Sequence, residues 1–162
     1  MSGVVRHIKV VNRLAKLITM PGGKKVGDAI ADAEAALGEI EGDCVAAIDE
    51  RLAELAAVAA AEGPAGGARL YALSNEIIPL AWMLKLRDLG QAAYSLCELI
   101  DLSSDREGGC DPRALTVHLE SLKLLRHADR LGQAGGEIVL DGLAKLVAHA
   151  KSLHGSAAKA AG

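Results

Sequence analysis

Histidine is the residue type whose chemistry bears most directly on function in this sequence, because an imidazole titrates near neutral pH and can act as nucleophile, base or metal ligand. The chain carries His7, His118, His127, His149 and His154. These five lie in different segments without a closely spaced set of carboxylates, so we expect no metal site. The sequence also lacks a phosphate-binding glycine loop with its lysine, a dinucleotide fingerprint, a GxSxG motif and an HExxH motif. We therefore expect a protein that is not an enzyme and that needs no cofactor.

His118 lies in a stretch with the periodicity of an amphipathic helix. On a helical wheel it falls on an apolar arc with Leu115, Leu119, Leu122 and Leu125. Two interpretations stay open. His118 either borders the core, which is the interpretation that we favour, or accepts a phosphoryl group from a partner, which requires an accessible imidazole.

His127 lies on the opposite, polar arc of the same helix. That arc also holds Thr116, Glu120, Lys123 and Arg130. Lys123, four residues before His127, and Arg130, three residues after it, could both reach a phosphate on this imidazole. His127 is thus a second candidate phosphoryl acceptor, although we favour its interpretation as a solvated surface histidine.

The first 25 residues form a basic segment with no acid. Its bases are Arg6, Lys9, Arg13, Lys16, Lys24 and Lys25, and its apolar residues Val4, Ile8, Val11 and Ile18 recur on one side of a helix. This arm (Arg6, Lys9, Arg13, Lys16) could bind an anionic membrane or an acidic partner. We favour a third interpretation, in which its apolar side closes the bundle beside the acidic residues that follow, and we expect no membrane contact.

Charge and composition argue against nucleic acid as a partner. The net charge is −3, and the basic N-terminal segment contains no aromatic residue that could stack on a base. The three cysteines, Cys44, Cys97 and Cys110, are odd in number and far apart. They are typical of reduced thiols, which places the protein in the cytoplasm. Basic residues spread through 4–18 argue against a signal peptide.

The elements that must position these residues are helices. Of the 162 residues, 51% are hydrophobic but only 2% aromatic, and four are proline, so Ala and Leu, both strong helix formers, must fill the core. No segment shows a sustained alternation of apolar and polar residues, the pattern of a half-buried strand, so we expect no sheet. We expect helices over 4–18, 27–61, 112–131 and 137–153, and two more within 68–102 that meet at 87–90. Gly132 to Gly136 should separate the last two helices.

The apolar stripes of these expected helices must be buried against one another. They predict an all-α fold, an antiparallel up-and-down bundle of about four to six helices. We divide the chain into a basic N-terminal helix and turn (1–25), the helical bundle (26–155) and a frayed tail (156–162). Asp111 and Pro112 supply the clearest helix start, an acidic N-cap followed by proline at the first helical position.

Several stretches carry a resemblance to known proteins. They read NRLAK at 12–16, PGGK at 21–24, LYALSNEI at 70–77, AYSLCEL at 93–99 and VHLESL at 117–122. Together they resemble a group of small alphaproteobacterial proteins that are encoded beside chemotaxis genes and labelled CheE. A helical bundle with an accessible helix histidine also resembles histidine phosphotransfer domains, whose usual pattern places lysine three residues after the histidine and glycine one further. Ser121 and Leu122 stand at those positions after His118.

The resemblance implies an accessory protein of a chemotaxis or two-component pathway. Its partner would be a response-regulator receiver domain or a histidine-kinase domain. The resemblance carries over no catalytic residue; if the protein relays phosphate, the spacing on the helix makes His118 or His127 the acceptor, with Lys123 and Arg130 as steadying cations. The alternative is a structural scaffold or homo-oligomeric interaction module without phosphorylation. Exposure separates the two hypotheses: a buried His118 with an unshielded surface patch favours the scaffold, and an imidazole that projects beside Lys123 favours the relay.

Overall fold

The computed structural model describes residues 24–104, 109–127 and 132–160. The chain divides into two compact units, residues 1–39 and residues 40–162. The packed helices described below lie within the second unit, from Ile40 onward. The predicted basic helix, with Arg6, Lys9, Arg13 and Lys16, lies outside the described residues, as does Arg130.

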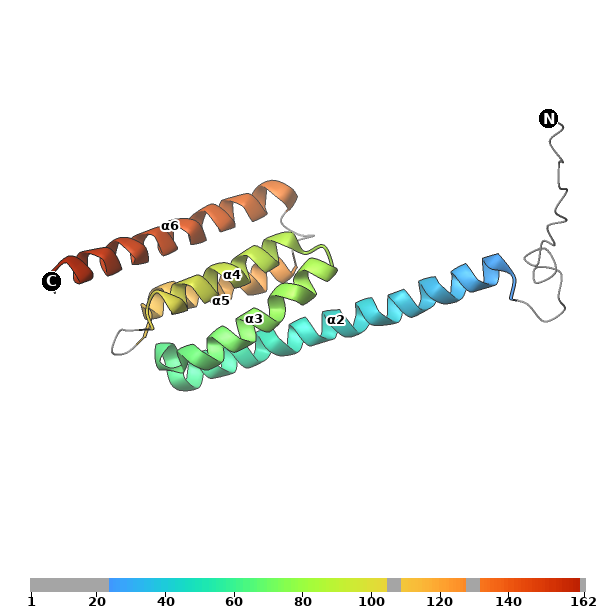
Figure 1. Cartoon of the computed structure of the whole chain (residues 1–162), viewed down its shortest axis with the longest axis horizontal. Coiled ribbons are helices and arrows are strands. Elements are labelled where there is room, and N and C mark those ends of the chain that lie inside the picture. Colours follow the sequence, from blue (N-terminus) through green and yellow to red (C-terminus); the bar gives the residue numbers. More distant parts are fainter. Residues whose placement is uncertain (1–23, 105–108, 128–131, 161–162) are drawn as a thin grey trace, which may run out of the picture. The chain divides into compact units, whose positions relative to one another are not determined.

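The predicted fold class is confirmed. The described residues form five α-helices and one 3₁₀ turn, without a strand. Within residues 40–162, consecutive helices run in opposite directions (Figure 1), as expected for an up-and-down bundle. Among the described segments, none is both long enough and apolar enough to cross a membrane as a helix.

Helix α2, Val26–Glu62, matches the predicted helix over 27–61 to within one residue at each end. Its side chains from residue 24 to residue 43 are all exposed. From there its apolar stripe is buried, through Cys44, Ile48, Leu52, Leu55 and Val58. Spacings of three and four residues put these five side chains on one face of the helix.

A 3₁₀ turn, η1 (Gly63–Gly66), follows α2 directly, and helix α3 occupies Gly67–Met83. Gly63 reverses the chain with φ of 57°, a conformation that glycine adopts without a Cβ penalty. Pro64 then starts the turn at a position where its missing N–H is not needed.

Helix α4 spans Arg87–Asp101, so the bend lies at Leu84–Leu86 and not at 87–90 as predicted. Lys85 has φ of 61°. Its N–H bonds to the Trp82 carbonyl at 3.1 Å, and the Leu86 N–H bonds to the Ala81 carbonyl at 2.8 Å. These two bonds form a Schellman motif, which usually takes glycine where Lys85 stands. The prediction failed because Lys85 carries no turn signal.

Helix α5 spans Pro112–Arg126, and the Asp111 side chain accepts from the Arg113 N–H at 3.0 Å. The predicted N-cap is thus confirmed, but the helix ends five residues earlier than the predicted residue 131. Helix α6 spans Gly132–Ala160. The expected break from Gly132 to Gly136 is therefore wrong, because these residues lie within α6. Packing against α4, described below, explains the presence of Gly136 near the start of α6.

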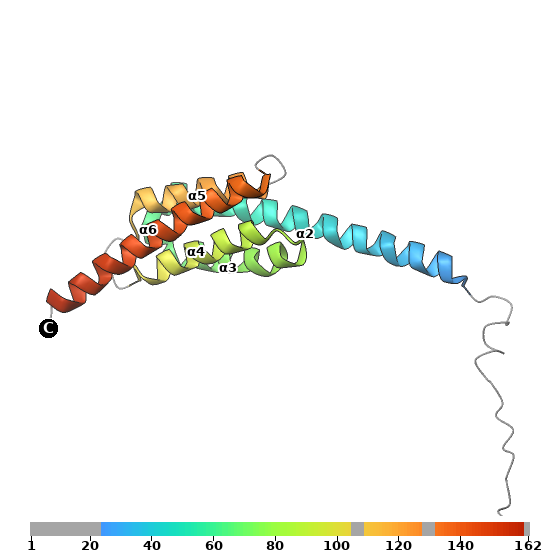
Figure 2. The same cartoon turned by 90° about the horizontal axis from the view of Figure 1, so that it is seen from above.

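The core lies between the second half of α2 and the four helices that follow. Its largest fully buried aliphatic side chains are Ile48, Leu55, Leu70, Ile77, Leu89, Leu96, Leu99, Leu122, Leu125 and Leu143. Helix α4 contacts α3, α5 and α6, and α6 lies beside α4 in both views (Figures 1 and 2). This central position of α4 decides where the histidine of α5 and the groove described below are found.

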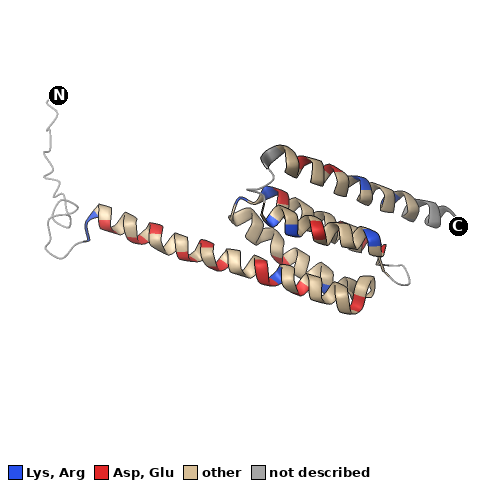
Figure 3. Cartoon of the chain, turned by 180° about the vertical axis from the view of Figure 1, so that it is seen from behind, with Lys and Arg blue, Asp and Glu red and all other residues tan. Residues whose placement is uncertain are grey.

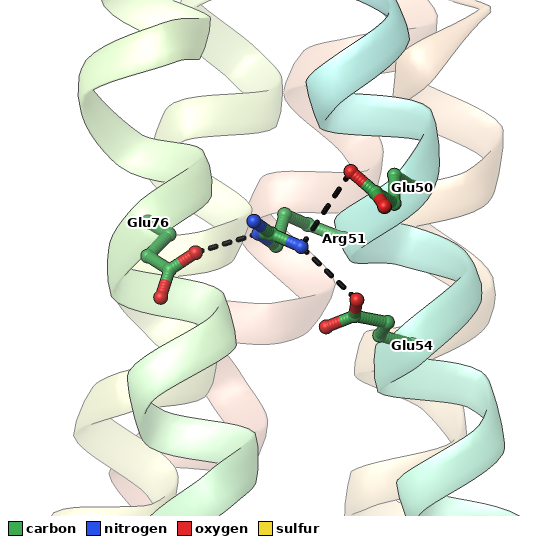
Figure 4. Close-up of polar contacts among 4 residues, drawn as sticks. All are labelled: Glu50, Arg51, Glu54 and Glu76. Carbon is green, nitrogen blue, oxygen red and sulfur yellow. Dashed lines mark hydrogen bonds and ion pairs between the residues drawn. The ribbon is translucent and has the colours of Figure 1, made fainter.

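Ion pairs tie α2 to its neighbours at the surface. Arg51 Nε donates to Glu76 of α3 at 2.6 Å, and its Nη1 lies 3.0 Å from Glu54 and 3.7 Å from Glu50 (Figure 4). The hydrogen bond to Glu76, opposed by desolvation, raises the pKa of Arg51 further above its already high value. The single base in the acidic sequence of α2 therefore neutralises carboxylates on two helices.

Candidate functional site

His118 lies inside the bundle, on the face of α5 that meets α4. Its side chain is 0% exposed. Its Nδ1 lies 2.8 Å from the carbonyl oxygen of Ala114, one turn earlier in α5, and its Nε2 lies 3.1 Å from the hydroxyl of Ser95 on α4. The favoured sequence interpretation of His118, a histidine beside the core, agrees with this placement.

The partners of His118 fix the position of its proton. A carbonyl oxygen only accepts hydrogen bonds, so Nδ1 carries the hydrogen that points at Ala114. Desolvation lowers the pKa of His118 below its ordinary value of 6.5, and the bond to Ala114 opposes that shift only in part. The ring is then neutral near pH 7, and Nε2 accepts from the Ser95 hydroxyl. Both ring nitrogens are used inside the protein, so a phosphoryl donor could reach neither without separating α4 from α5.

Ser95 and His118 lie as a nucleophile and a base would, but their surroundings do not suit acyl transfer. Ser95 is in the middle of α4, where backbone N–H groups are already bonded along the helix. An oxyanion needs free donors aimed at it. The Ser95 hydroxyl therefore supplies a hydrogen-bond donor to a buried imidazole.

His127 is the accessible histidine of the two candidates. It is the exposed C-cap residue of α5, and its N–H bonds to the Leu124 carbonyl at 3.2 Å. Lys123 bonds to Glu120 at 2.8 Å, so its ammonium group is already paired. A helix C-terminus carries partial negative charge, which disfavours a phosphate placed there. Two of the predicted partners, His127 and Lys123, thus share one helix end, while Arg130 lies outside the described residues.

A groove lies between α4 and α6, and one of its lining residues is Ser95, the partner of His118. Its volume is about 440 Å³. It is lined by Gln91, Tyr94, Ser95 and Glu98 of α4 and by Leu140, Asp141, Leu143, Ala144, Val147, Ala148 and Lys151 of α6. Tyr94 is 64% exposed at the rim, whereas Leu143 and Val147 are buried at 1% and 3%. The groove thus combines an apolar floor with an exposed aromatic ring, as ligand and partner sites often do.

Two contacts between α4 and α6 lie beside this groove. Lys151 bonds to Glu98 at 2.6 Å. At the start of α6, a Cβ placed on Gly136 would stand 2.1 Å from a carboxylate oxygen of Asp88. Glycine at this position therefore lets α6 approach α4 closely, which explains why a residue that usually breaks helices lies inside one.

Sequence reasoning missed Ser95, Tyr94 and the groove. Ser95 carries no motif, and its importance comes from a contact between helices that are separate in sequence. An exposed tyrosine on a strongly amphipathic helix was the available signal for Tyr94, because aromatic residues are rare in this chain.

A second cavity, of about 540 Å³, lies at the C-terminal end of α4 and includes Tyr71, Ile100 and Cys110. All three cysteines are free and buried, and burial raises the pKa of Cys97 to about 11. Within the described ranges, His, Cys, Asp and Glu side chains form no group of three or more that could hold a metal ion.

Comparison with known proteins gives no match: no protein-family model fits the chain, and no curated protein or solved structure is significantly similar to it.

Proposed function

We propose that this chain is a non-enzymatic binding module of a bacterial chemotaxis or two-component pathway, and that its helical body binds a receiver or histidine-kinase domain. The observation that carries this proposal is the groove between α4 and α6. It offers an apolar floor, a 64% exposed tyrosine and a polar margin, the combination that protein interfaces favour.

The state of His118 favours binding over relay. A relay through this residue needs an exposed, nucleophilic nitrogen. His118 is 0% exposed, and its two nitrogens are bonded to Ala114 and Ser95. A buried His118 beside an unshielded patch is the combination that we expected of a scaffold.

The signalling setting rests on sequence. The resemblance to the CheE group covers LYALSNEI in α3, AYSLCEL in α4 and VHLESL in α5. AYSLCEL contains Tyr94 and Ser95, and VHLESL contains His118, so two of the resembling stretches meet at the Ser95–His118 bond. Three free, buried cysteines support a cytoplasmic location, where thiols stay reduced.

Calorimetric titration of the full-length protein with receiver and kinase domains of the same organism tests the proposal. Ala144 is an exposed residue of the groove wall, so Ala144→Arg should fill the groove and weaken binding by about tenfold or more. The control is Leu124→Arg, since Leu124 is 46% exposed on α5 and does not line the groove. Thermal unfolding checks that both variants fold. Equal affinity of both variants would refute the groove as the binding site, and no binding by any receiver or kinase domain would refute the function.

A relay through His127 is the second candidate function, because that imidazole is exposed. Incubation with phosphorylated receiver and kinase domains should then give an acid-labile, base-stable label. The label should disappear in His127→Gln and persist in His118→Gln. If the wild-type protein binds these domains but takes up no label, the relay is refuted and only the scaffold function remains.

A further inference from the structure

The first half of α2 presents an apolar stripe that the described structure leaves uncovered. Within residues 24–39, Val26 is 76% exposed, Ile30 54% and Leu37 59%. With Ala33 they follow steps of four, three and four residues, which place them on one face of the helix. Large apolar residues in such a row normally pack against another element.

The charges beside this stripe specify the chemistry of what could cover it. Residues 26–39 contain Asp28, Asp32, Glu34 and Glu39 and no base, and acidic side chains continue along α2 (Figure 3). A second copy of the same surface would bring like charges together, which opposes self-association. The stripe therefore suits a basic amphipathic helix.

We propose that residues 4–18 of the same chain occupy this stripe as an antiparallel helix. Val4, Ile8, Val11, Ala15 and Ile18 repeat the steps of four and three residues found in α2. The segment carries Arg6, Lys9, Arg13 and Lys16 and no acid. Sequence pattern and charge are thus both complementary to the first half of α2.

The register of the pairing follows from the connection. Pro21-Gly22-Gly23 is a helix-breaking turn between the two segments. Ile18 and Val26 lie at equal distances along the chain from Gly22, and so do Val11 and Ala33. An antiparallel hairpin would set these pairs side by side, with the small Ala33 opposite the larger Val11.

The start of α2 is consistent with such a reversal. Lys24, which precedes the helix, forms an ion pair with Asp32, more than one turn inside it. The ion pair places the basic side chain of Lys24 along the first turns of α2, beside an acidic residue of this half of the helix. The short connection also keeps the local concentration of the basic segment high, so that modest contacts suffice to hold it.

Disulfide trapping in the full-length protein tests the pairing. Val11→Cys combined with Ala33→Cys should form an intramolecular disulfide under mild oxidation, seen as faster migration on a non-reducing gel. The matched control is Val11→Cys with Ala35→Cys, because Ala35 lies on the opposite face of α2. The native cysteines are buried and stay in place in both variants.

Each outcome of the trapping is informative. The hairpin is supported if the disulfide forms at least about tenfold faster in the Ala33→Cys variant than in the control. A dimer-linked product would assign the stripe to a second copy, and equal trapping of both variants would show no defined register; either result overturns the proposal. Sedimentation with vesicles that contain phosphatidylserine adds a third arm, since quantitative binding through residues 4–18 would assign the segment to a membrane instead.

Hydrogen exchange supplies a measurement that does not depend on engineered cysteines. Val11→Asp should speed amide exchange across residues 30–39 by about tenfold, because it places a charge at the contact. Asn12→Asp adds the same charge beside that position and should change exchange much less. Unchanged exchange in Val11→Asp would contradict the hairpin even if the cysteine variants fail to fold.

Discussion

The hydroxyl of Ser95 lies 3.1 Å from Nε2 of His118, and Ser95 is also one of the residues that line the groove between α4 and α6. One residue thus links the groove to a buried imidazole on another helix. A partner group that drew this hydroxyl into the groove would leave Nε2 buried without a donor, at a cost typical of an unsatisfied polar group. The bond therefore couples the surface of the groove to the packing of α4 against α5.

Burial of His118 should make folding stability depend on pH on the acid side. The imidazole has an ordinary pKa of 6.5, and desolvation lowers this pKa in the folded state. Below about pH 6.5 the unfolded chain then binds a proton that the native protein does not, so stability falls as pH falls. The slope approaches about 1.4 kcal/mol per pH unit for this one group, until the pH reaches the folded-state pKa.

Urea unfolding between about pH 7.5 and 5 measures this slope. His118→Gln should remove most of the contribution of this histidine to the slope. An unaltered slope in His118→Gln would show that His118 is not held neutral by the fold.

Removal of the Ser95 hydroxyl should lower the free energy of unfolding, because this hydroxyl is the donor to a buried ring nitrogen of His118. Ser95→Ala leaves Nε2 of His118 unpaired at a site that is 0% exposed, and we expect a loss of about 1–3 kcal/mol. Thr116→Ala is the matched control, because the Thr116 hydroxyl donates to the Pro112 carbonyl at 2.9 Å on the exposed side of α5. That variant should stay within about 0.5 kcal/mol of the wild type. Equal losses in both would contradict the role of the hydroxyl.

The bend between α3 and α4 should become more stable when Lys85 is replaced by glycine. Lys85 has φ of 61°, a conformation that costs a residue with a Cβ about 1 kcal/mol. Lys85→Gly should relieve this cost and raise the free energy of unfolding by about 0.5–1 kcal/mol. Lys85→Ala keeps the Cβ and should give no gain, so an equal effect of both variants in urea titrations would assign the change to the lysine side chain.

The position of a helix end could be predicted from the sequence where it depends on a few neighbouring residues. The start of α5 depends on Asp111 and Pro112, two adjacent residues with a known capping role. The bend at Lys85 could not be predicted, because a non-glycine residue there gives no local signal. The glycines that begin α6 misled the prediction for the opposite reason: Gly136 breaks a helix by propensity, but its approach to Asp88 favours it within the fold.

In the candidate site, too, features that depend on one helix could be predicted, whereas contacts between helices could not. A helical wheel sufficed to place His118 beside the core and His127 on the polar face, since both properties depend on spacing within one helix. The partner of His118 is 23 residues away in sequence on another helix. The groove likewise requires the packing of α6 on α4. These relationships are set by tertiary contacts, which periodicity does not encode.

A substitution at Gly109 tests the packing of the segment before α5 against η1. It has φ of 75°, and a Cβ on it would stand 2.3 Å from the carbonyl oxygen of Pro64 in η1. Gly109→Ala therefore combines an unfavourable backbone conformation with a clash against a backbone atom that cannot rotate away. We expect a loss of roughly 2–4 kcal/mol in the free energy of unfolding.

Gly142→Ala is the control for this substitution. Gly142 lies within α6, and a methyl group added to its Cα would meet no atom within 4 Å outside the neighbouring helix backbone, so alanine there should stabilise the helix by about 0.5–1 kcal/mol. Opposite signs for the same chemical change would show that the close contact between Gly109 and Pro64 exists in solution. A neutral Gly109→Ala would instead mean that η1 and the start of α5 are not held together by this contact, and that the cavity lined by Pro64, Tyr71 and Cys110 has a different shape.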